Sequence, residues 1–145
     1  MNSCFLSGRH DAPDALQPAI KEAAENHIRQ LHVLRFIVGS RGHFDTMAAQ
    51  SLIQLKDQYP QITLEILLPY HPSSVREALP KGFDAFYYPF DEPVPARYAI
   101  ASANRKVLRA CSHLIICASR IGHTGKLLEQ ARRREARGLL HITQL

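Results

Sequence analysis

Short runs of hydrophobic residues alternate with amphipathic stretches along the whole chain. The runs are nearly continuous in Val, Ile, Leu and Phe, which is typical of strands covered on both faces of a sheet. They predict strands at Cys4–Ser7, Leu34–Val38, Thr63–Leu68, Ala85–Tyr88, His113–Cys117 and Leu139–Thr143. Because strands that alternate with helices form a parallel sheet with right-handed crossovers, we predict a doubly wound α/β sandwich.

The stretches between these strands repeat hydrophobic residues at helical spacing. One stripe consists of Leu16, Ile20, Ala24, Ile28 and Leu31, and another of Phe44, Ala48, Leu52 and Leu55. Pro95 predicts the start of a further helix from about Ala96 to Cys111, and Gly138 predicts the end of the last helix. Helices of this number and spacing are enough to cover both faces of a mostly parallel sheet of about six strands.

The remaining segments are predicted to be loops within one domain, residues 1–145. Ser74 and Glu77 stand at capping-box spacing, which predicts a short helix that Pro80 ends. No repeat, linker or low-complexity segment interrupts the sequence. No hydrophobic run approaches the roughly 18 residues that span a membrane, and the first residues lack the pattern of a signal peptide. We therefore expect a cytoplasmic protein with no membrane partner.

Composition changes this picture little. With 46% hydrophobic and 21% charged residues, the chain resembles an ordinary globular protein. The cysteines lack metal-site spacing and predict reduced, buried thiols; they are Cys4, Cys111 and Cys117. Much of the net charge of +5 comes from the segment ARRREARG, residues 131–138. Such a run is more typical of the solvated face of a helix than of a phosphate-binding surface.

Four loops follow the predicted strands at their carboxyl ends, where open α/β sheets bind ligands. They are Ser7–Asp11, Gly39–Asp45, Pro69–Ser73 and Ala118–Gly125, the last of which includes Arg120. Glycines that precede helices, together with basic and hydroxyl side chains, suit an anion at a helix N-terminus. The sequence therefore predicts a phosphate-bearing small molecule here. Its expected binding residues are Ser7, Gly8, Arg9, Gly39, Ser40, Arg41, Gly42, Asp45, Asn104, Gly122, Thr124, Gly125 and Lys126.

Several simpler interpretations stay open for these loops. Any single glycine is explained better by a tight turn than by an anion site. The loops also contain His10, His43, His71 and His123. Because these histidines lack metal-ligand spacing, the sequence predicts no metal site and no cofactor. The absence of GxGxxG and GxxxxGK[ST] motifs argues against the usual dinucleotide fold and against a P-loop kinase.

Asn104 and Glu129 each have a structural and a functional interpretation. Asn104 lies on the hydrophobic stripe of its predicted helix, so its amide should face the sheet and needs a partner. A backbone loop or a ligand would satisfy it. Glu129 follows the Gly122–Gly125 loop by one helical turn. It either complements the helix dipole or contributes a carboxylate to a site.

The segment IVGSRGHFDTMAAQSLIQLKDQYPQITLEILLPY resembles the second Rossmann unit of the SLOG superfamily, especially of its YpsA-like members. The shared features are a Gly-rich turn, a Phe-Asp pair before an Ala-rich helix, and a Tyr-Pro pair before a strand that ends in Pro and an aromatic residue. Here they are Gly39, Gly42, Phe44-Asp45, Ala48-Ala49, Tyr59-Pro60 and Pro69-Tyr70. The resemblance extends through ANRKVLRACSHLIICASRIGHTGKLLEQA and implies a Rossmann-like domain over nearly the whole chain.

The same superfamily contains the LOG phosphoribohydrolases, which cut the N-glycosidic bond of nucleoside 5′-monophosphates, and the DprA proteins, which handle single-stranded DNA. LOG enzymes carry the motif GGxGTxxE, and this chain has GHTGKLLE at residues 122–129. His123 and Lys126 depart from that motif. Asn104 and Arg105 stand where the enzymes have Arg and Lys. The resemblance thus implies a phosphate cradle more strongly than glycosidase chemistry.

Three functional hypotheses follow, in this order. The first is a sensor or binding module for a nucleotide or nucleotide-derived ligand at the carboxyl edge of the sheet. The second is a nucleoside 5′-monophosphate phosphoribohydrolase in which Glu129 positions water or stabilises the ribosyl cation, and Arg105 holds the phosphate. The third is binding of single-stranded DNA, for which the candidate stacking residues are Tyr87, Tyr88 and Tyr98. The sequence leaves open whether the chain forms a homo-oligomer.

Overall fold

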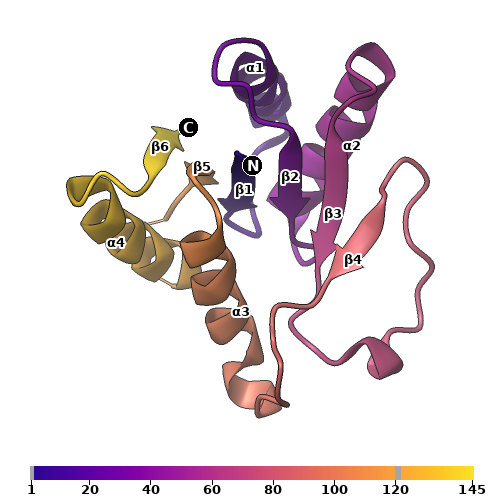
Figure 1. Cartoon of the computed structure of the whole chain (residues 1–145), viewed down its shortest axis with the longest axis vertical. Helices are drawn as coiled ribbons and strands as arrows, with labels where there is room; N and C mark the ends of the chain where they lie inside the picture. Colours follow the sequence, from indigo (N-terminus) through magenta and orange to yellow (C-terminus); the bar gives the residue numbers. More distant parts are fainter. Residues whose placement is uncertain (1, 120–121) are drawn as a thin grey trace.

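The computed structural model describes residues 2–119 and 122–145. Within these residues, six strands form one sheet in the order β4-β3-β2-β1-β5-β6, and every neighbouring pair is parallel (Figure 1). The strands are β1 (Ser3–Gly8), β2 (Arg35–Val38), β3 (Thr63–Leu67), β4 (Ala85–Tyr87), β5 (His113–Cys117) and β6 (His141–Gln144). The predicted α/β, Rossmann-like, doubly wound fold is confirmed.

Helices of the described part of the chain cover both faces of the sheet. They are α1 (Gln17–Arg29), α2 (His43–Gln58), α3 (Ala96–Ala110) and α4 (His123–Ala136), with two short 3-10 helices, η1 (Asp14–Leu16) and η2 (Pro72–Ser74). The first two α-helices pack on one face and the last two on the other. None of the helices in residues 2–119 and 122–145 is long and hydrophobic enough to cross a membrane.

Alternating side chains of the central strand explain why both faces are filled. On β1, Cys4 and Leu6 pack into the cluster formed with α1 and α2, whereas Phe5 packs into the cluster formed with α3 and α4. Both clusters need hydrophobic residues, so the strand reads as a continuous hydrophobic run. Each large side chain buried in this way contributes roughly 1.5–3 kcal/mol from hydrophobic burial. All three cysteines are buried free thiols, as the sequence predicted.

The segment between β3 and β4 differs from the prediction, because the expected helix beginning at Ser74 is not formed. The chain makes only η2 there, and residues 75–84 contain no helix. The hydroxyl of Ser74 donates to the carbonyl oxygen of His71 at 2.6 Å, so it belongs to the preceding turn and does not cap a following one. The few residues before Pro80 are also too short a segment to stabilise an isolated helix.

The arginine-rich end of α4 is mostly exposed, as predicted. Arg132 forms an ion pair with Glu135, and Arg133 is exposed. Arg134 differs, because it is half-buried and donates from its guanidinium to the carbonyl oxygen of Arg109 at 3.4 Å. One arginine of the run therefore joins α4 to the end of α3.

The order of the strands reverses between β1 and β5. The chain builds outward from β1 through β2, β3 and β4, and α3 then returns it to place β5 on the other side of β1. The loops that follow β1 and β5 consequently lead to helices on opposite faces, which opens a crevice at the carboxyl edge of the sheet.

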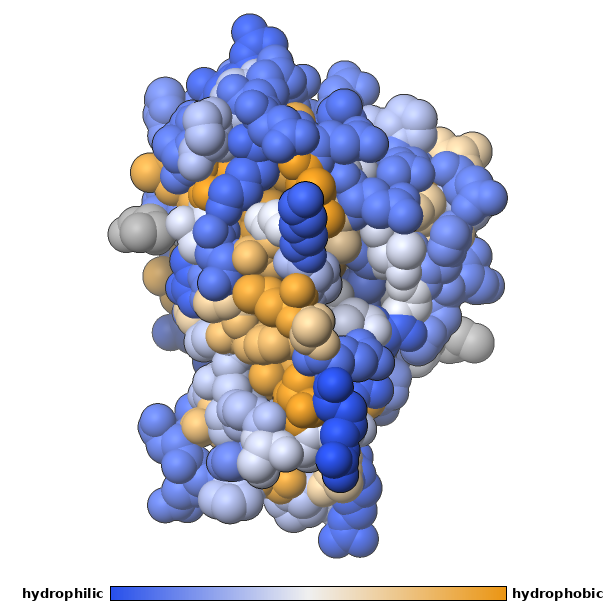
Figure 2. Space-filling view, turned by 90° about the vertical axis from the view of Figure 1, so that its right-hand side faces the viewer, coloured by the Kyte–Doolittle hydropathy of each residue, from blue (hydrophilic) through white to orange (hydrophobic). Residues whose placement is uncertain are grey.

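The sheet has two edge strands, and the one opposite β6 is the short strand β4. Figure 2 faces this side of the molecule and shows a band of hydrophobic residues between hydrophilic ones. Leu79 and Phe86 are partly buried against the cluster of α1 and α2. A three-residue edge strand offers few free backbone groups for pairing with another sheet.

We expect the replacement Gly8→Ala to destabilise the protein by about 1–3 kcal/mol, the usual cost of overpacking a core. A Cβ atom at Gly8 would overlap the ring of Phe44, which is 0% exposed. The free energy of unfolding, measured by urea denaturation, checks this result.

The double-mutant cycle with Phe44→Ala identifies the cause. Removing the ring costs about 3–5 kcal/mol by itself, but Gly8→Ala should then add little because its steric partner is gone. Strictly additive losses would show that Gly8 is needed for a reason other than the Phe44 ring.

Candidate functional site

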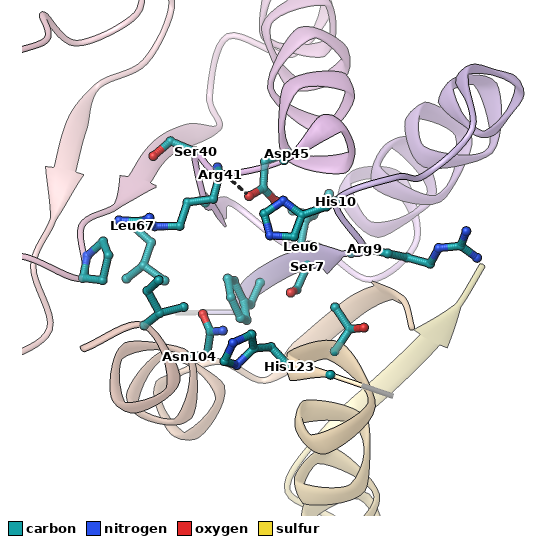
Figure 3. Close-up of a pocket in the computed structure, with 18 of the residues that line it drawn as sticks. Leu6, Ser7, Arg9, His10, Ser40, Arg41, Asp45, Leu67, Asn104 and His123 are labelled. Carbon is teal, nitrogen blue, oxygen red and sulfur yellow. Dashed lines mark hydrogen bonds between the residues drawn. The ribbon is translucent and has the colours of Figure 1, made fainter. Parts of the chain in front are cut away.

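A cavity of about 730 Å³ lies at the carboxyl edge of the sheet, beside the reversal of the strand order. The loops after β1 and β2, the start of α4 and one side of α3 surround it (Figure 3). Its volume is within the range of about 300–1,000 Å³ that is typical of small-molecule sites. The predicted binding residues that line it are Ser7, Gly8, Arg9, Gly39, Ser40, Arg41, Gly42, Asp45, Asn104, Gly122 and Thr124.

The predicted residues Gly125, Lys126, Arg105 and Glu129 do not line this cavity. Lys126 and Glu129 are both exposed on α4. The buried residues of this helix are Leu127 and Ala131. Arg105 is exposed on α3, where its guanidinium donates to the hydroxyl of Ser102 at 3.3 Å. The two residues named for the glycosidase hypothesis are therefore outside the cavity. Arg120 lies outside the described residues.

Three glycines of the site are required by packing within the protein. Gly8 adjoins the ring of Phe44. A Cβ atom at Gly39 would lie 2.8 Å from a carboxylate oxygen of Asp45, and one at Gly42 would lie 2.9 Å from the Cα atom of His10. The sequence suggested that glycine leaves room for an anion at these positions, but protein atoms occupy the space where each side chain would begin.

Gly122 has a different role, because it sets the backbone at the start of α4. Its φ angle is +87°, in the left-handed region that glycine adopts without strain. A Cβ atom added at this position would have no described atom within 4 Å, apart from those of its two chain neighbours. Gly122 is exposed and lines the cavity, and no side chain of the described residues caps the helix that it begins. This helix start presents its backbone N–H groups without a capping side chain.

Asp45 lies in the first turn of α2, whose N-cap residue is Gly42. Its carboxylate accepts a hydrogen bond from the backbone N–H of Arg41 at 3.0 Å. Burial raises the pKa of Asp45 from 3.8 to about 6, although this hydrogen bond and the nearby side chains of His10 and Arg41 act in the opposite direction. An anion at this helix start would meet the carboxylate, so the start of α4 is the better anion site of the two.

The two arginines at the cavity are arranged differently. The guanidinium of Arg41 lies over the ring of Tyr70, 4.8 Å from the ring centroid, and its side chain runs along the cavity in Figure 3. The guanidinium of Arg9 is 3.0 Å from a carboxylate oxygen of Asp11 and points away from Ser7 and Asn104 in Figure 3. Arg41 is therefore the better placed of the two to contact a bound molecule.

Asn104 is half-buried and points toward the cavity (Figure 3). Within residues 2–119 and 122–145 its amide has no hydrogen-bond partner. The sequence predicted either a backbone loop or a ligand as the partner of this amide, and no backbone group of the described residues bonds to it. The amide can therefore donate to and accept from a molecule in the cavity.

The sequence missed the hydrophobic side of this cavity and one of its carboxylates. Phe5, Leu67 and Ile100 contribute apolar side chains, and Glu77 contributes the carboxylate. The strand residues were recognised only as core, because burial in the sheet and exposure to a cavity at its edge look alike in a sequence. Glu77 was placed in the helix that does not form.

The candidate histidines divide into two pairs. His10 and His123 line the cavity. The ring of His43 forms a hydrogen bond with the carboxylate of Asp14, and His71 accepts a hydrogen bond from the backbone N–H of Ser73 at 3.1 Å. Of these four histidines, only the first pair lines the cavity.

Comparison with known proteins supports the fold. No family model and no curated protein matches the sequence. The structure is similar to that of DNA processing protein A (DprA) from Streptococcus pneumoniae, with a TM-score of 0.72 and 12% sequence identity. The match covers 99% of this chain and 50% of that one, so the chain spans about half the length of the solved structure. At this identity the similarity shows the fold alone.

We expect the stability of the protein to fall as the pH rises from about 4 to about 6, to the extent that Asp45 controls it. The folded-state pKa of about 6 exceeds the value of 3.8 for an unperturbed carboxyl, so the folded state binds the proton more tightly. Asp45→Asn should therefore be more stable than the wild type above pH 7, by about 1–3 kcal/mol, and similar to it below pH 4.

Urea denaturation across this pH range measures the difference. Asp57→Asn, at an exposed position near the other end of the same helix, is the matched control and should follow the wild type. If Asp45→Asn is the less stable protein at pH 8, the hydrogen bond from Arg41 outweighs the burial of the charge.

Proposed function

We propose that this chain binds a nucleotide or a nucleotide-derived ligand in the cavity at the carboxyl edge, as a sensor or binding module. The observation that carries the proposal is that, within the described residues, a helix start without a side-chain cap, an amide without a partner and an apolar surface meet in one cavity. A nucleotide needs these three features, because it combines an anionic phosphate, a polar base edge and an apolar base face.

The phosphate is best accommodated at the start of α4. Backbone N–H groups and the positive end of the helix dipole favour an anion there. The hydroxyl oxygen of Thr124 already accepts a hydrogen bond from the backbone N–H of Ser119 at 3.0 Å. The hydroxyl hydrogen of Thr124 is then the part that can donate to a phosphate oxygen.

The nucleoside fits the opposite part of the cavity. Phe5 and Ile100 provide apolar contacts for the base, and Asn104 provides a donor and an acceptor for its edge. Above a pH of about 6 the carboxylate of Asp45 is ionised and can accept hydrogen bonds from ribose hydroxyls. Arg41 lies near enough to the same wall to add a positive charge.

The other two hypotheses have weaker support. Hydrolysis of a nucleoside monophosphate would require Glu129 and Arg105 at the site, and neither residue lines the cavity. The fold shared with a DNA processing protein favours DNA binding as the second candidate. Each of its proposed stacking residues already contacts a side chain: Arg35 lies over Tyr87, and His71 packs against Tyr88. Arg97 lies over Tyr98, which is still 52% exposed.

Titration of the purified chain with a panel of nucleoside monophosphates, followed by calorimetry, tests the proposal. We expect one of them to bind, and Asn104→Ala to weaken that binding about five- to tenfold, the range for one neutral hydrogen bond. Arg105→Ala, the exposed neighbour on the same helix, is the matched control and should leave the affinity unchanged.

Two further measurements separate the alternatives. Binding of a single-stranded oligonucleotide without binding of any monophosphate would replace the proposal with DNA binding. Steady release of free base, lost in Glu129→Gln, would make the protein a phosphoribohydrolase despite the position of that residue. Equal affinity of Asn104→Ala and wild type would show that the cavity is not the site.

A further inference from the structure

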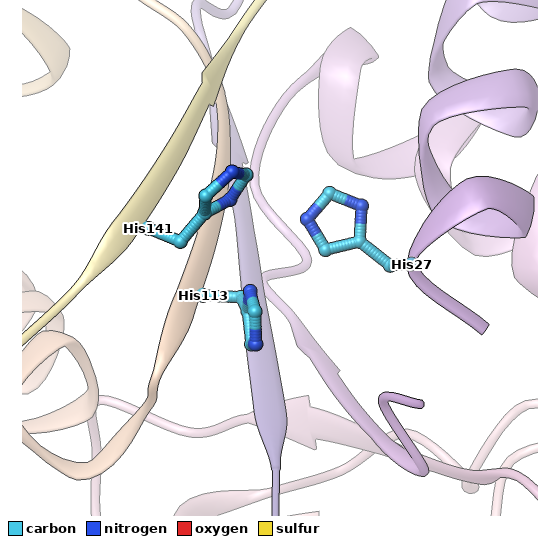
Figure 4. A group of neighbouring side chains, drawn as sticks. All are labelled: His27, His113 and His141. Carbon is cyan, nitrogen blue, oxygen red and sulfur yellow. The ribbon is translucent and has the colours of Figure 1, made fainter. Parts of the chain in front are cut away.

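Three histidines from distant parts of the chain meet at the amino edge of the sheet, opposite the cavity. His27 lies near the end of α1, and His113 and His141 are the first residues of β5 and β6, where they are register partners. Each offers a ring nitrogen, and these nitrogens all lie within 4.8 Å of one another. Figure 4 shows the three rings turned toward a common point.

The hydrogen bonding of His27 determines which of its nitrogens is free. Its Nδ1 atom is 2.7 Å from the carbonyl oxygen of Ala23. A carbonyl oxygen only accepts hydrogen bonds, so Nδ1 carries the proton and Nε2 carries a lone pair in the neutral ring. His27 is 1% exposed, and Nε2 has no partner among the described residues.

A second nitrogen of the cluster is also buried without a hydrogen-bond partner among the described residues. Nδ1 of His113 is buried and has no hydrogen-bond partner within the described part of the chain. Buried polar atoms are nearly always satisfied, and each exception needs an explanation. Two such nitrogens beside each other, with the ring of an exposed histidine next to them, indicate a cation as the shared partner.

The charge state of the rings permits this interpretation. Burial lowers the pKa of His27, and burial together with the charges of the other two rings lowers the pKa of His113 to about 4. Burial therefore favours the neutral form of both rings. Metal ions bind neutral imidazole, whereas a protonated ring has no lone pair to offer.

We propose that His27, His113 and His141 form a binding site for a divalent transition-metal ion, with Zn²⁺ as the leading candidate. Three imidazoles suit Zn²⁺, Cu²⁺ or Ni²⁺, whereas Mg²⁺ and Ca²⁺ require oxygen ligands. The hydrogen bond from His27 to the Ala23 carbonyl is the kind of outer contact that orients a metal-binding histidine.

The arrangement needs only a small contraction to hold the ion. Zinc–nitrogen bonds of about 2.0–2.1 Å in tetrahedral geometry place two ligand nitrogens roughly 3.3 Å apart. His141 is exposed on the edge strand β6, so its side chain is free to rotate toward the two buried rings. Three protein ligands leave a fourth position, which is available to water or another ligand.

A metal ion at this point would join α1, β5 and β6. The strand β6 is the last of the sheet and is paired on one side only, with β5. Binding to the folded chain alone would therefore raise its thermal stability by linkage and hold this edge strand in place. This effect does not depend on the cavity, which is at the other end of the strands.

The experiment is a titration of the EDTA-treated full chain with ZnCl₂, followed by calorimetry and thermal unfolding. Binding of one Zn²⁺ per chain and a rise of the melting temperature are expected. Titration with CoCl₂ should give the visible absorption of tetrahedral Co²⁺. His141→Ala should bind Zn²⁺ at least tenfold more weakly, as the loss of one ligand requires.

Controls separate this site from adventitious histidines. His141 is exposed, so its replacement should leave the fold intact, and it decides the test even if His27→Ala does not fold. His32→Asn removes an exposed histidine outside the cluster, at a positive φ that asparagine tolerates, and should bind Zn²⁺ like the wild type. Failure of the wild type to bind, or equal binding by His141→Ala, would overturn the proposal. Asn104→Ala should retain Zn²⁺ binding. The nucleotide proposal and the metal proposal are therefore tested independently.

Discussion

The burial of β1 on both faces is the constraint on which the rest of this structure depends. Leu6 faces the cluster of α1 and α2, and Phe5 faces the cluster of α3 and α4, so the strand must have helices on either side. Because β1 lies between β2 and β5, the two halves of the chain diverge from it. The crevice at its carboxyl end follows from this divergence and not from any residue of the crevice itself.

The first turn of α2 shows how packing and site chemistry are linked. Phe44 fills the space above Gly8, and the next residue, Asp45, then lies against the loop of Gly39 and Arg41. The carboxylate satisfies a backbone N–H group at this helix start and makes it unsuitable for an anion. Neither helix start has a side-chain cap in the described residues, so the carboxylate of Asp45 is the difference that orients the proposed nucleotide with its phosphate toward α4.

The two ends of the parallel strands carry different chemistry. The carboxyl ends lead into loops and helix starts, which suit a polar, anionic molecule. At the amino ends the side chains of adjacent strands stand side by side in register, as His113 and His141 do. The same sheet therefore supports a proposed nucleotide site and a proposed metal site that share no residue.

The sequence by itself determined the strands, most of the helices and the loops that surround the cavity. Continuous hydrophobic runs identify strands covered on two faces, and the carboxyl-edge rule then selects the loops without any coordinates. Ser7 and Arg41, which line the cavity, were selected in this way, whereas Asn104 was selected from its place on the hydrophobic stripe of a helix. The predicted helix at Ser74 was wrong because a capping pattern records only local preference, and the hydroxyl was already used by His71.

Only the tertiary structure decided the features that depend on contacts between distant residues. The sequence cannot show that Gly42 adjoins His10, or that the carboxylate of Asp45 is buried enough to raise its pKa. The histidine cluster was missed for the same reason. No short spacing joins its members, and they meet because the register of β5 with β6 sets two of them side by side beneath α1. Local patterns determine elements, whereas sites arise where packing brings the elements together.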